Sequence, residues 1–254
     1  MMNEFTGLFY LLVFVLGTAI GSFLNVVIYR MPQEKSVIMP PSACGACETF
    51  LKWKDLIPLI SYISLRGRCR YCQEPFSLRY PFVEGTNGLA YLVIYGTFGL
   101  TLEGFAAAFL FSLLLAVVFI DIDHMIIPDQ LMLTALIIGI PLTAFQSLEK
   151  LLSGFIGLLV GGGLLLLIAI VSKGGMGGGD IKLAGILGLF LGWPQILLVL
   201  FFSFFLGAIA GLAIILYQGK TMKEAIPFGP YLAIAALIVL FWGNSILTWY
   251  QQWM

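Results

Sequence analysis

Long apolar runs dominate the chain, and the breaks between them define the predicted elements. The runs cover residues 7–28, 85–120, 130–171, 183–217 and 227–242. A helix needs about 20 apolar residues to cross a bilayer core, so each of the three middle runs is long enough for two crossings. These three are interrupted at 101–103, 146–150 and 192–195. The pattern predicts an all-α polytopic membrane protein with about eight transmembrane helices.

Composition agrees with this prediction. Of the 254 residues, 60% are hydrophobic and only 10% are charged, against about 25% charged in ordinary soluble domains. The mean hydropathy is +1.02. These values exclude a soluble globule, a disordered chain and a small disulfide-rich secreted protein. The 13 basic and 13 acidic residues cancel, which removes the case for a nucleic-acid partner held by phosphate attraction.

Lys and Arg predict the orientation, because cytoplasmic loops carry an excess of them. Eight of the 13 basic residues lie in 29–84. A model with eight spans places four more basic residues on the same side of the membrane as 29–84. They lie in later connections between spans and are Lys173, Lys182, Lys220 and Lys223. Only Lys150 lies opposite. We therefore expect that side to be the cytoplasm and both termini to lie outside. The first run lacks the basic start and small-residue cleavage site of a signal peptide, so we expect it to stay as a span.

One sizeable polar segment separates the first span from the rest. We expect three regions: a first transmembrane helix over 1–28, a small cytoplasmic four-cysteine domain over 29–84, and a transmembrane core over 85–254. The middle region holds two Cys-x-x-Cys pairs with 21 residues between them, made by Cys44, Cys47, Cys69 and Cys72.

Two such pairs can wrap one tetrahedral ion, because each brings two thiolates together on a tight turn. The sequence therefore predicts zinc, in a structural site, since four thiolates leave no open position for catalysis. Disulfides are the competing interpretation, but thiols stay reduced in the cytoplasm. A redox pair would not need a second copy nearby. Zinc would fold a domain otherwise too small and polar to hold a core.

Acidic residues at membrane depth indicate the chemistry, since an acid there costs a few kcal/mol and is a functional candidate by default. Asp121 ends one apolar run and Asp180 follows the glycine-rich stretch 174–179, 59 residues later. Both lie at predicted cytoplasmic helix ends and can converge. Two adjacent carboxyls share a proton, so that one activates water while the other polarises a peptide carbonyl. The glycine-rich stretch before Asp180 would let the backbone approach Asp180 and the substrate closely.

Plainer interpretations compete with these. Asp121, Asp123 and Asp129 each fit the wet headgroup zone, and Pro128 with Asp129 fits a helix start. His124, the single histidine, fits an interfacial residue better than a base or ligand. The glycine run is not a P-loop, because it lacks the Lys and Ser/Thr that follow such a loop.

The order of short motifs along almost the whole chain resembles the bacterial type IV prepilin peptidase family, bifunctional leader peptidases and N-methyltransferases. The matching stretches are 21–25 with Tyr29, Arg30 and Pro32, the two cysteine pairs, 55–58 with 61–62, 79–84, Asp121 with 128–129, 177–182 and 226–230. Each is modestly specific, whereas all of them in this order are very specific.

The resemblance implies an intramembrane aspartic endopeptidase with Asp121 and Asp180 as the catalytic pair. It implies a supporting catalytic loop containing Gly177, Gly179 and Lys182. It further implies cleavage of type III leader peptides of prepilins or pseudopilins after Gly, at the cytoplasmic face of the bacterial inner membrane. S-adenosylmethionine would then methylate the new N-terminus. Pilus or secretion machinery would be an indirect partner, alongside membrane lipid.

Two other classes of function remain open from the sequence. A proton-coupled transporter also carries lone acids and glycine breaks in its helices, but it predicts acids near the midplane and inverted repeats, neither of which is detectable. An assembly scaffold would use the four-cysteine domain for docking. The methyl-donor site has no sequence fingerprint, because 56 residues between the first two spans are too few for a Rossmann domain.

Overall fold

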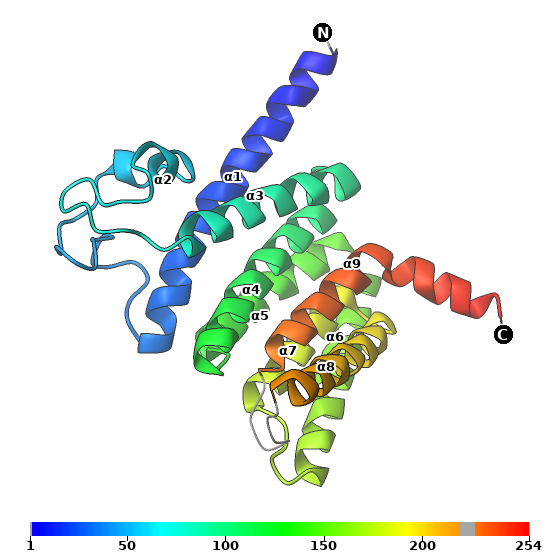
Figure 1. Ribbon diagram of the computed structural model, residues 1–254. Coiled ribbons are helices and arrows are strands. Elements are labelled where there is room, and N and C mark those ends of the chain that lie inside the picture. Colours follow the sequence, from blue (N-terminus) through cyan, green and yellow to red (C-terminus); the bar gives the residue numbers. More distant parts are fainter. Residues whose placement is uncertain (1, 219–226, 254) are drawn as a thin grey trace. The chain divides into compact units, whose positions relative to one another are not determined.

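Helices make up nearly all of the regular structure. A computed structural model describes residues 2–218 and 227–253, and two isolated β-bridges accompany the helices there. The α-helices are α1 (Met2–Arg30), α2 (Ile60–Ser64), α3 (Arg79–Phe98), α4 (Leu102–His124), α5 (Asp129–Gln146), α6 (Leu148–Val171), α7 (Gly178–Leu191), α8 (Gln195–Gln218) and α9 (Gly229–Gln251) (Figure 1). Two 3₁₀ turns, η1 (Met31–Gln33) and η2 (Trp53–Asp55), lie between α1 and α2. The predicted all-α class is confirmed.

The helix boundaries follow the predicted breaks. α3 ends at Phe98 and α4 begins at Leu102, while α5 and α6 meet at Ser147 and α7 and α8 at 192–194. Six helices in the described ranges are long and apolar enough to cross a membrane: α1, α4, α5, α6, α8 and α9. The protein is therefore a multi-pass membrane protein. The other two predicted spans are helical, as α3 and α7, but fall short of these length or hydropathy limits.

The chain divides into two compact units, Met1–Ala116 and Val117–Met254, and the boundary falls within α4. In the first unit α1 packs against α3 (Figure 1). A buried polar chain reinforces this packing: the Asn87 side-chain amide donates to the Gly17 carbonyl at 2.7 Å, and Ser112 donates to Asn87 at 2.9 Å. Such interhelical hydrogen bonds satisfy polar groups that lipid cannot.

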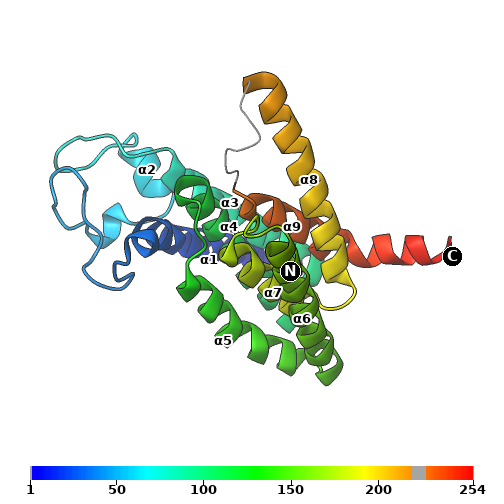
Figure 2. The ribbon, with the colours of Figure 1, turned by 90° about the horizontal axis from the view of Figure 1, so that it is seen from below.

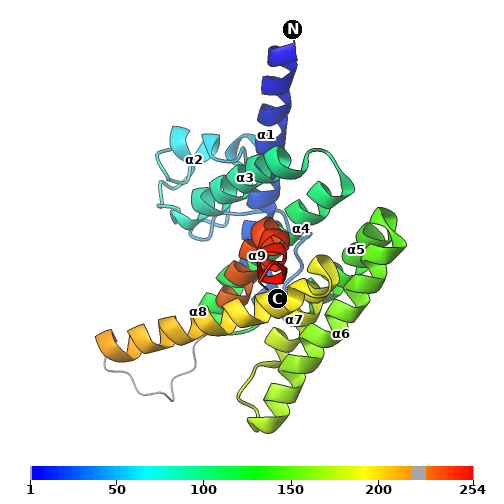
Figure 3. The same cartoon turned by 90° about the vertical axis from the view of Figure 1, so that its right-hand side faces the viewer.

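In the second unit α7 makes contact with α5, α6, α8 and α9 (Figure 2). α5 and α6 lie side by side as a hairpin (Figure 3). The closest approach is between α6 and α7, where a Cβ on Gly188 would lie 2.0 Å from the Gly157 carbonyl oxygen. Glycine at both positions lets the two backbones touch, which holds α7 close against α6.

Some sequence predictions fall on residues outside the described ranges. They are the positions of Lys220 and Lys223 in the last predicted cytoplasmic connection, and Ile226 at the start of the final motif. The division into 1–28, 29–84 and 85–254 remains a prediction, although α1 extends to Arg30 and α3 already begins at Arg79.

Candidate active site and metal centre

Asp121 lies in the last turn of α4 with its side chain turned inward. The residue is only 5% exposed, whereas Asp123 is exposed. The Asp121 carboxylate accepts a hydrogen bond from the backbone N–H of Gly229 at 2.9 Å. A carboxylate near a helix C-terminus is disfavoured by the helix dipole, but Gly229 begins α9, whose N-terminus favours negative charge. This contact therefore offsets part of the cost that burial imposes on an ionised Asp121.

Gly229 leaves no room for a side chain at this point. A Cβ built there would lie 2.7 Å from Asp121 Oδ2. The sequence motif at 226–230 indicated no such role, because the two residues are 108 positions apart.

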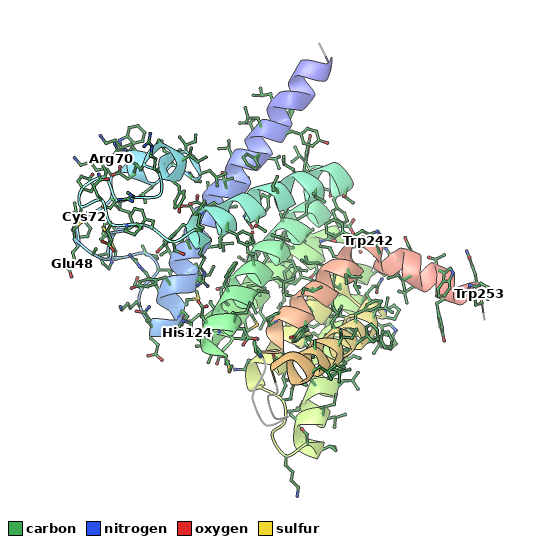
Figure 4. The ribbon with its side chains drawn as sticks, in the orientation of Figure 1. Glu48, Arg70, Cys72, His124, Trp242 and Trp253 are labelled. Atoms are coloured by element: carbon green, nitrogen blue, oxygen red, sulfur yellow. The ribbon has the colours of Figure 1, made fainter. Side chains whose placement is uncertain are left out.

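Asp180 lies in the first turn of α7, three residues after the N-cap Gly177. It is half-buried and lies outside the six candidate spans. Burial and the negative charge of Asp121 raise the pKa of Asp180 to about 6, although a hydrogen bond from the Gly177 backbone opposes this. The second unit thus places the two predicted acids near enough for the charge of Asp121 to act on Asp180. Asp123 and His124 are exposed, and His124 lies at the end of α4 (Figure 4).

Residues near Asp180 connect the N-terminal turn of α7 to neighbouring segments of the second unit. Lys182 forms an ion pair with Asp129, which joins the first turn of α7 to the first turn of α5. Both side chains are largely exposed, so the pair contributes orientation more than stability. A Cβ on Gly179 would lie 2.8 Å from the Ile127 side chain, so glycine permits this close approach. The end of α4 and the starts of α5, α7 and α9 thus carry the polar site.

The four cysteines converge in the first unit. Their sulfur atoms all lie within 4.8 Å of one another, and Cys44 Sγ is 3.7 Å from Cys72 Sγ. Tetrahedral zinc with Zn–S bonds of about 2.3 Å separates its sulfurs by about 3.8 Å. Cys44 and Cys69 are buried, whereas Cys72 (labelled in Figure 4) is exposed. The cluster has the geometry and donor set to hold one metal ion.

Both cysteine pairs sit on the same local fold. The N–H of the first cysteine bonds to the carbonyl five residues later, Cys44 to Thr49 and Cys69 to Glu74. The residue after the second cysteine has positive φ in each case, 56° at Glu48 and 62° at Gln73. Each turn therefore presents two sulfurs on one side, and a hydrogen bond with Thr49 lowers the pKa of Cys47 to about 6.

A buried carboxylate braces the second of these turns. Asp55 accepts from Arg70 Nε at 2.6 Å, from the Tyr71 hydroxyl at 3.0 Å and from the Lys52 N–H at 3.1 Å. Burial raises the pKa of Asp55, but these hydrogen bonds outweigh it and lower the pKa overall. The carboxylate ties η2 to the residues between Cys69 and Cys72.

Known proteins show the same pattern along the chain. Residues 15–98 match the Bacterial Peptidase A24 N-terminal domain and residues 108–212 match the Type IV leader peptidase family. A protein named Prepilin leader peptidase/N-methyltransferase in Legionella pneumophila is 37% identical over 96% of both chains. The chain belongs to the type IV leader peptidase family. The predicted family and enzyme class, a prepilin leader peptidase with N-methyltransferase activity, are confirmed.

Other members of the leader peptidase family are equally similar. The protein of the same name in Aeromonas hydrophila is 39% identical over 96% of this chain and 94% of the relative. The one in Bacillus subtilis (strain 168) is 32% identical over 94% and 96%. No solved structure matches the chain significantly.

Proposed function

We propose that this leader peptidase cleaves prepilin or pseudopilin leader peptides after Gly, with Asp121 and Asp180 as its catalytic pair. One observation carries the assignment of residues: two half-buried or buried carboxyls from α4 and α7 interact electrostatically although 59 residues separate them. Aspartic proteolysis requires two neighbouring carboxyl groups, of which one is ionised while the other keeps its proton.

The surroundings of the two acids support different roles. The Gly229 N–H favours an ionised Asp121, which accepts a proton from water as the water oxygen attacks the scissile carbonyl carbon. Asp180, with its raised pKa, keeps its proton more readily and donates it to the carbonyl oxygen. Collapse of the tetrahedral intermediate breaks the C–N bond. Asp121 passes the proton taken from water to the leaving amine, and one hydroxyl of the intermediate returns its proton to Asp180 as the product carboxyl forms.

The remaining parts of the proposal concern cofactors and place. S-adenosylmethionine, when bound, would supply the methyl group that the enzyme transfers to the new N-terminal amine. The four cysteine thiolates would hold zinc, and the free energy of metal binding would stabilise the fold of the 29–84 domain. The acids face the cytoplasm from the bacterial inner membrane, in keeping with the basic residues predicted on that side.

A cleavage assay with purified protein and a prepilin tests the catalytic pair. Asn keeps the shape of Asp but cannot ionise, so Asp121→Asn and Asp180→Asn should each abolish cleavage. The double variant should be no worse than either single one, because the pair acts as a unit. The matched control is Asp123→Asn, which is exposed in α4 and should retain substantial activity.

The outcomes separate the competing functions. Methylation of a substrate supplied already cleaved should survive all three changes. Normal cleavage by Asp121→Asn or Asp180→Asn would remove the aspartic mechanism. A wild-type protein that leaves the prepilin intact would instead favour the transporter or the scaffold. If Asp123→Asn were inactive and Asp121→Asn active, the catalytic residue of α4 would be Asp123 instead of Asp121.

A further inference from the structure

An uncharged apolar run lies within the otherwise polar four-cysteine segment. Residues 56–65 carry no charge, and basic residues flank them on both sides, at Lys52 and Lys54 before and at Arg66 and Arg68 after. A run of this length is too short to cross a bilayer. It is typical of a buried core helix or of a segment that lies at the membrane interface.

The structure distinguishes these two cases. Ile60 and Ile63 lie one turn apart on the same face of α2 and are 64% and 73% exposed. Trp53, just before the run, is 79% exposed. Ser61 instead is the buried residue of α2. The apolar face of α2 is therefore not a core face among the described residues of its unit.

A hydrogen bond anchors α2 to the membrane helices. The Leu59 N–H donates to Glu84 Oε2 of α3 at 2.8 Å, and Leu59 has a φ of 60°, which is strained for a leucine. Glu84 is buried against α1, since a Cβ on Gly21 would lie 2.7 Å from the Glu84 Cα. Gly21 lies inside the candidate span Gly7–Gln33. The start of α2 is thus held beside a membrane-spanning helix.

The charges around α2 match an anionic surface. Lys52, Lys54, Arg66 and Arg68 are all exposed, whereas Arg70 is paired with Asp55. Basic residues next to a membrane contribute about 1 kcal/mol each toward anionic lipid. Exposed Trp and branched aliphatic side chains suit the boundary between headgroups and acyl chains.

We propose that α2 and its basic flanks are a membrane-interface anchor for the four-cysteine domain. Ile60 and Ile63 insert at the headgroup boundary of the adjacent leaflet, and the flanking Lys and Arg bind the phosphates of anionic phospholipids. The anchor and the Leu59–Glu84 hydrogen bond together fix the domain against the bilayer surface. A protein helix seated on the same face is the competing occupant, and the test below separates it from lipid.

Photo-crosslinking in the full-length protein identifies the occupant. p-Benzoylphenylalanine is placed at position 63 and, as a matched control, at position 48, an exposed residue of the cysteine cluster. The proteins are reconstituted in nanodiscs with or without phosphatidylglycerol, illuminated and analysed by mass spectrometry. We expect lipid adducts at 63 and few at 48, with a yield at 63 that falls roughly fivefold without the anionic lipid.

Two results would overturn the anchor: protein adducts alone at 63, or a lipid yield at 63 no higher than at 48. An equal yield in both kinds of nanodisc would refute the anionic partner. A double variant, Lys52→Gln with Lys54→Gln, tests whether the basic flanks bind anionic lipid. It should lower the yield of lipid adducts at position 63 in anionic nanodiscs. Lys35→Gln, exposed but outside the run, should not lower it. An unchanged yield in the double variant counts against the basic flanks.

Discussion

Asp121 and Asp123 are two positions apart in α4, and this spacing decides which of them is buried. A step of two residues turns a helix by about 200°, so only one of them faces the interior of the unit. The structure buries Asp121 and exposes Asp123, which agrees with the choice made from the motif. The assignment of catalysis to Asp121 and Asp180 remains a proposal until the Asn variants are assayed.

Replacing Asp180 should stabilise the protein at neutral pH. The pKa of Asp180 is about 6 in the folded protein and about 3.9 in an unfolded chain. The folded state therefore holds the proton more tightly, and stability falls as pH rises from about 4 to about 6. Asp180→Asn removes this loss, so it should melt at a higher temperature than the wild type at pH 7.5 while losing cleavage.

Thermal unfolding in detergent at two pH values checks this. The difference in melting temperature should vanish near pH 4, where the wild-type carboxyl is also neutral. A lower melting temperature for Asp180→Asn at pH 7.5 would mean that its carboxylate stabilises the fold, which contradicts a raised pKa.

Gly229→Ala should impair catalysis while leaving the fold intact. The new methyl group would lie 2.7 Å from Asp121 Oδ2, and the carboxylate can swing away more easily than the backbone can move. Misplacing a reacting group by about 1 Å costs roughly 100-fold in rate, so we expect a loss of that order in kcat. Gly207→Ala is the control, because its Cβ would make only an ordinary 3.5 Å contact. Equal rates for both variants would show that Gly229 does not position Asp121.

The sequence alone could identify both acids but not what holds them. An ionisable residue at a helix end is visible from its neighbours, whereas the Gly229 N–H reaches Asp121 across 108 positions. Lys182 illustrates the same limit. The resemblance placed it in the catalytic loop, and the structure adds a partner, Asp129, that only the arrangement of α5 and α7 reveals.

Among the helices, the contact of α6 with α7 is the one that sets the position of Asp180. Gly188→Ala would bring a methyl carbon within 2.0 Å of the Gly157 carbonyl oxygen, so one backbone must move. Overpacking of this kind costs roughly 1–3 kcal/mol. We expect a lower melting temperature and a reduced cleavage rate, because α7 carries Asp180 in its first turn.

Gly163→Ala provides the comparison within α6. A Cβ there meets nothing within 4 Å, and Ala favours a helix over Gly by about 1 kcal/mol. It should leave melting unchanged or raise it slightly. If Gly188→Ala behaves like Gly163→Ala, the close contact is not needed to hold α7.

Helix boundaries were predictable because glycine, proline and polar residues interrupt the apolar runs. The break at 146–150 became the Ser147 N-cap of α6, whose hydroxyl accepts from the Lys150 N–H. The start of α3 was not predictable: the charges of Arg79 and Glu84 separate this stretch from the apolar run in the sequence, but Glu84 is buried against α1. Tertiary contact decided that boundary.

The topology depends on whether α3 and α7 cross the membrane. Reporter fusions at 60, 125 and 176 should report the cytoplasm, and fusions at 102, 148 and 194 the opposite side. The pairs 60/102 and 176/194 flank α3 and α7 respectively. The same side for both members of a pair would show that the helix between them does not cross. Position 222, predicted cytoplasmic, lies outside the described residues.

The bracing of the cysteine turns has a consequence for proteolysis. Eight of the 13 Lys and Arg residues, the sites at which trypsin cuts, lie in 29–84. Asp55 ties η2 to the turn between Cys69 and Cys72, so removal of the proposed zinc ion should loosen both stretches together. A chelator would then convert a protease-resistant membrane protein into one nicked between α1 and α3. The fragment pattern on a gel would report metal occupancy in native membranes, without purification.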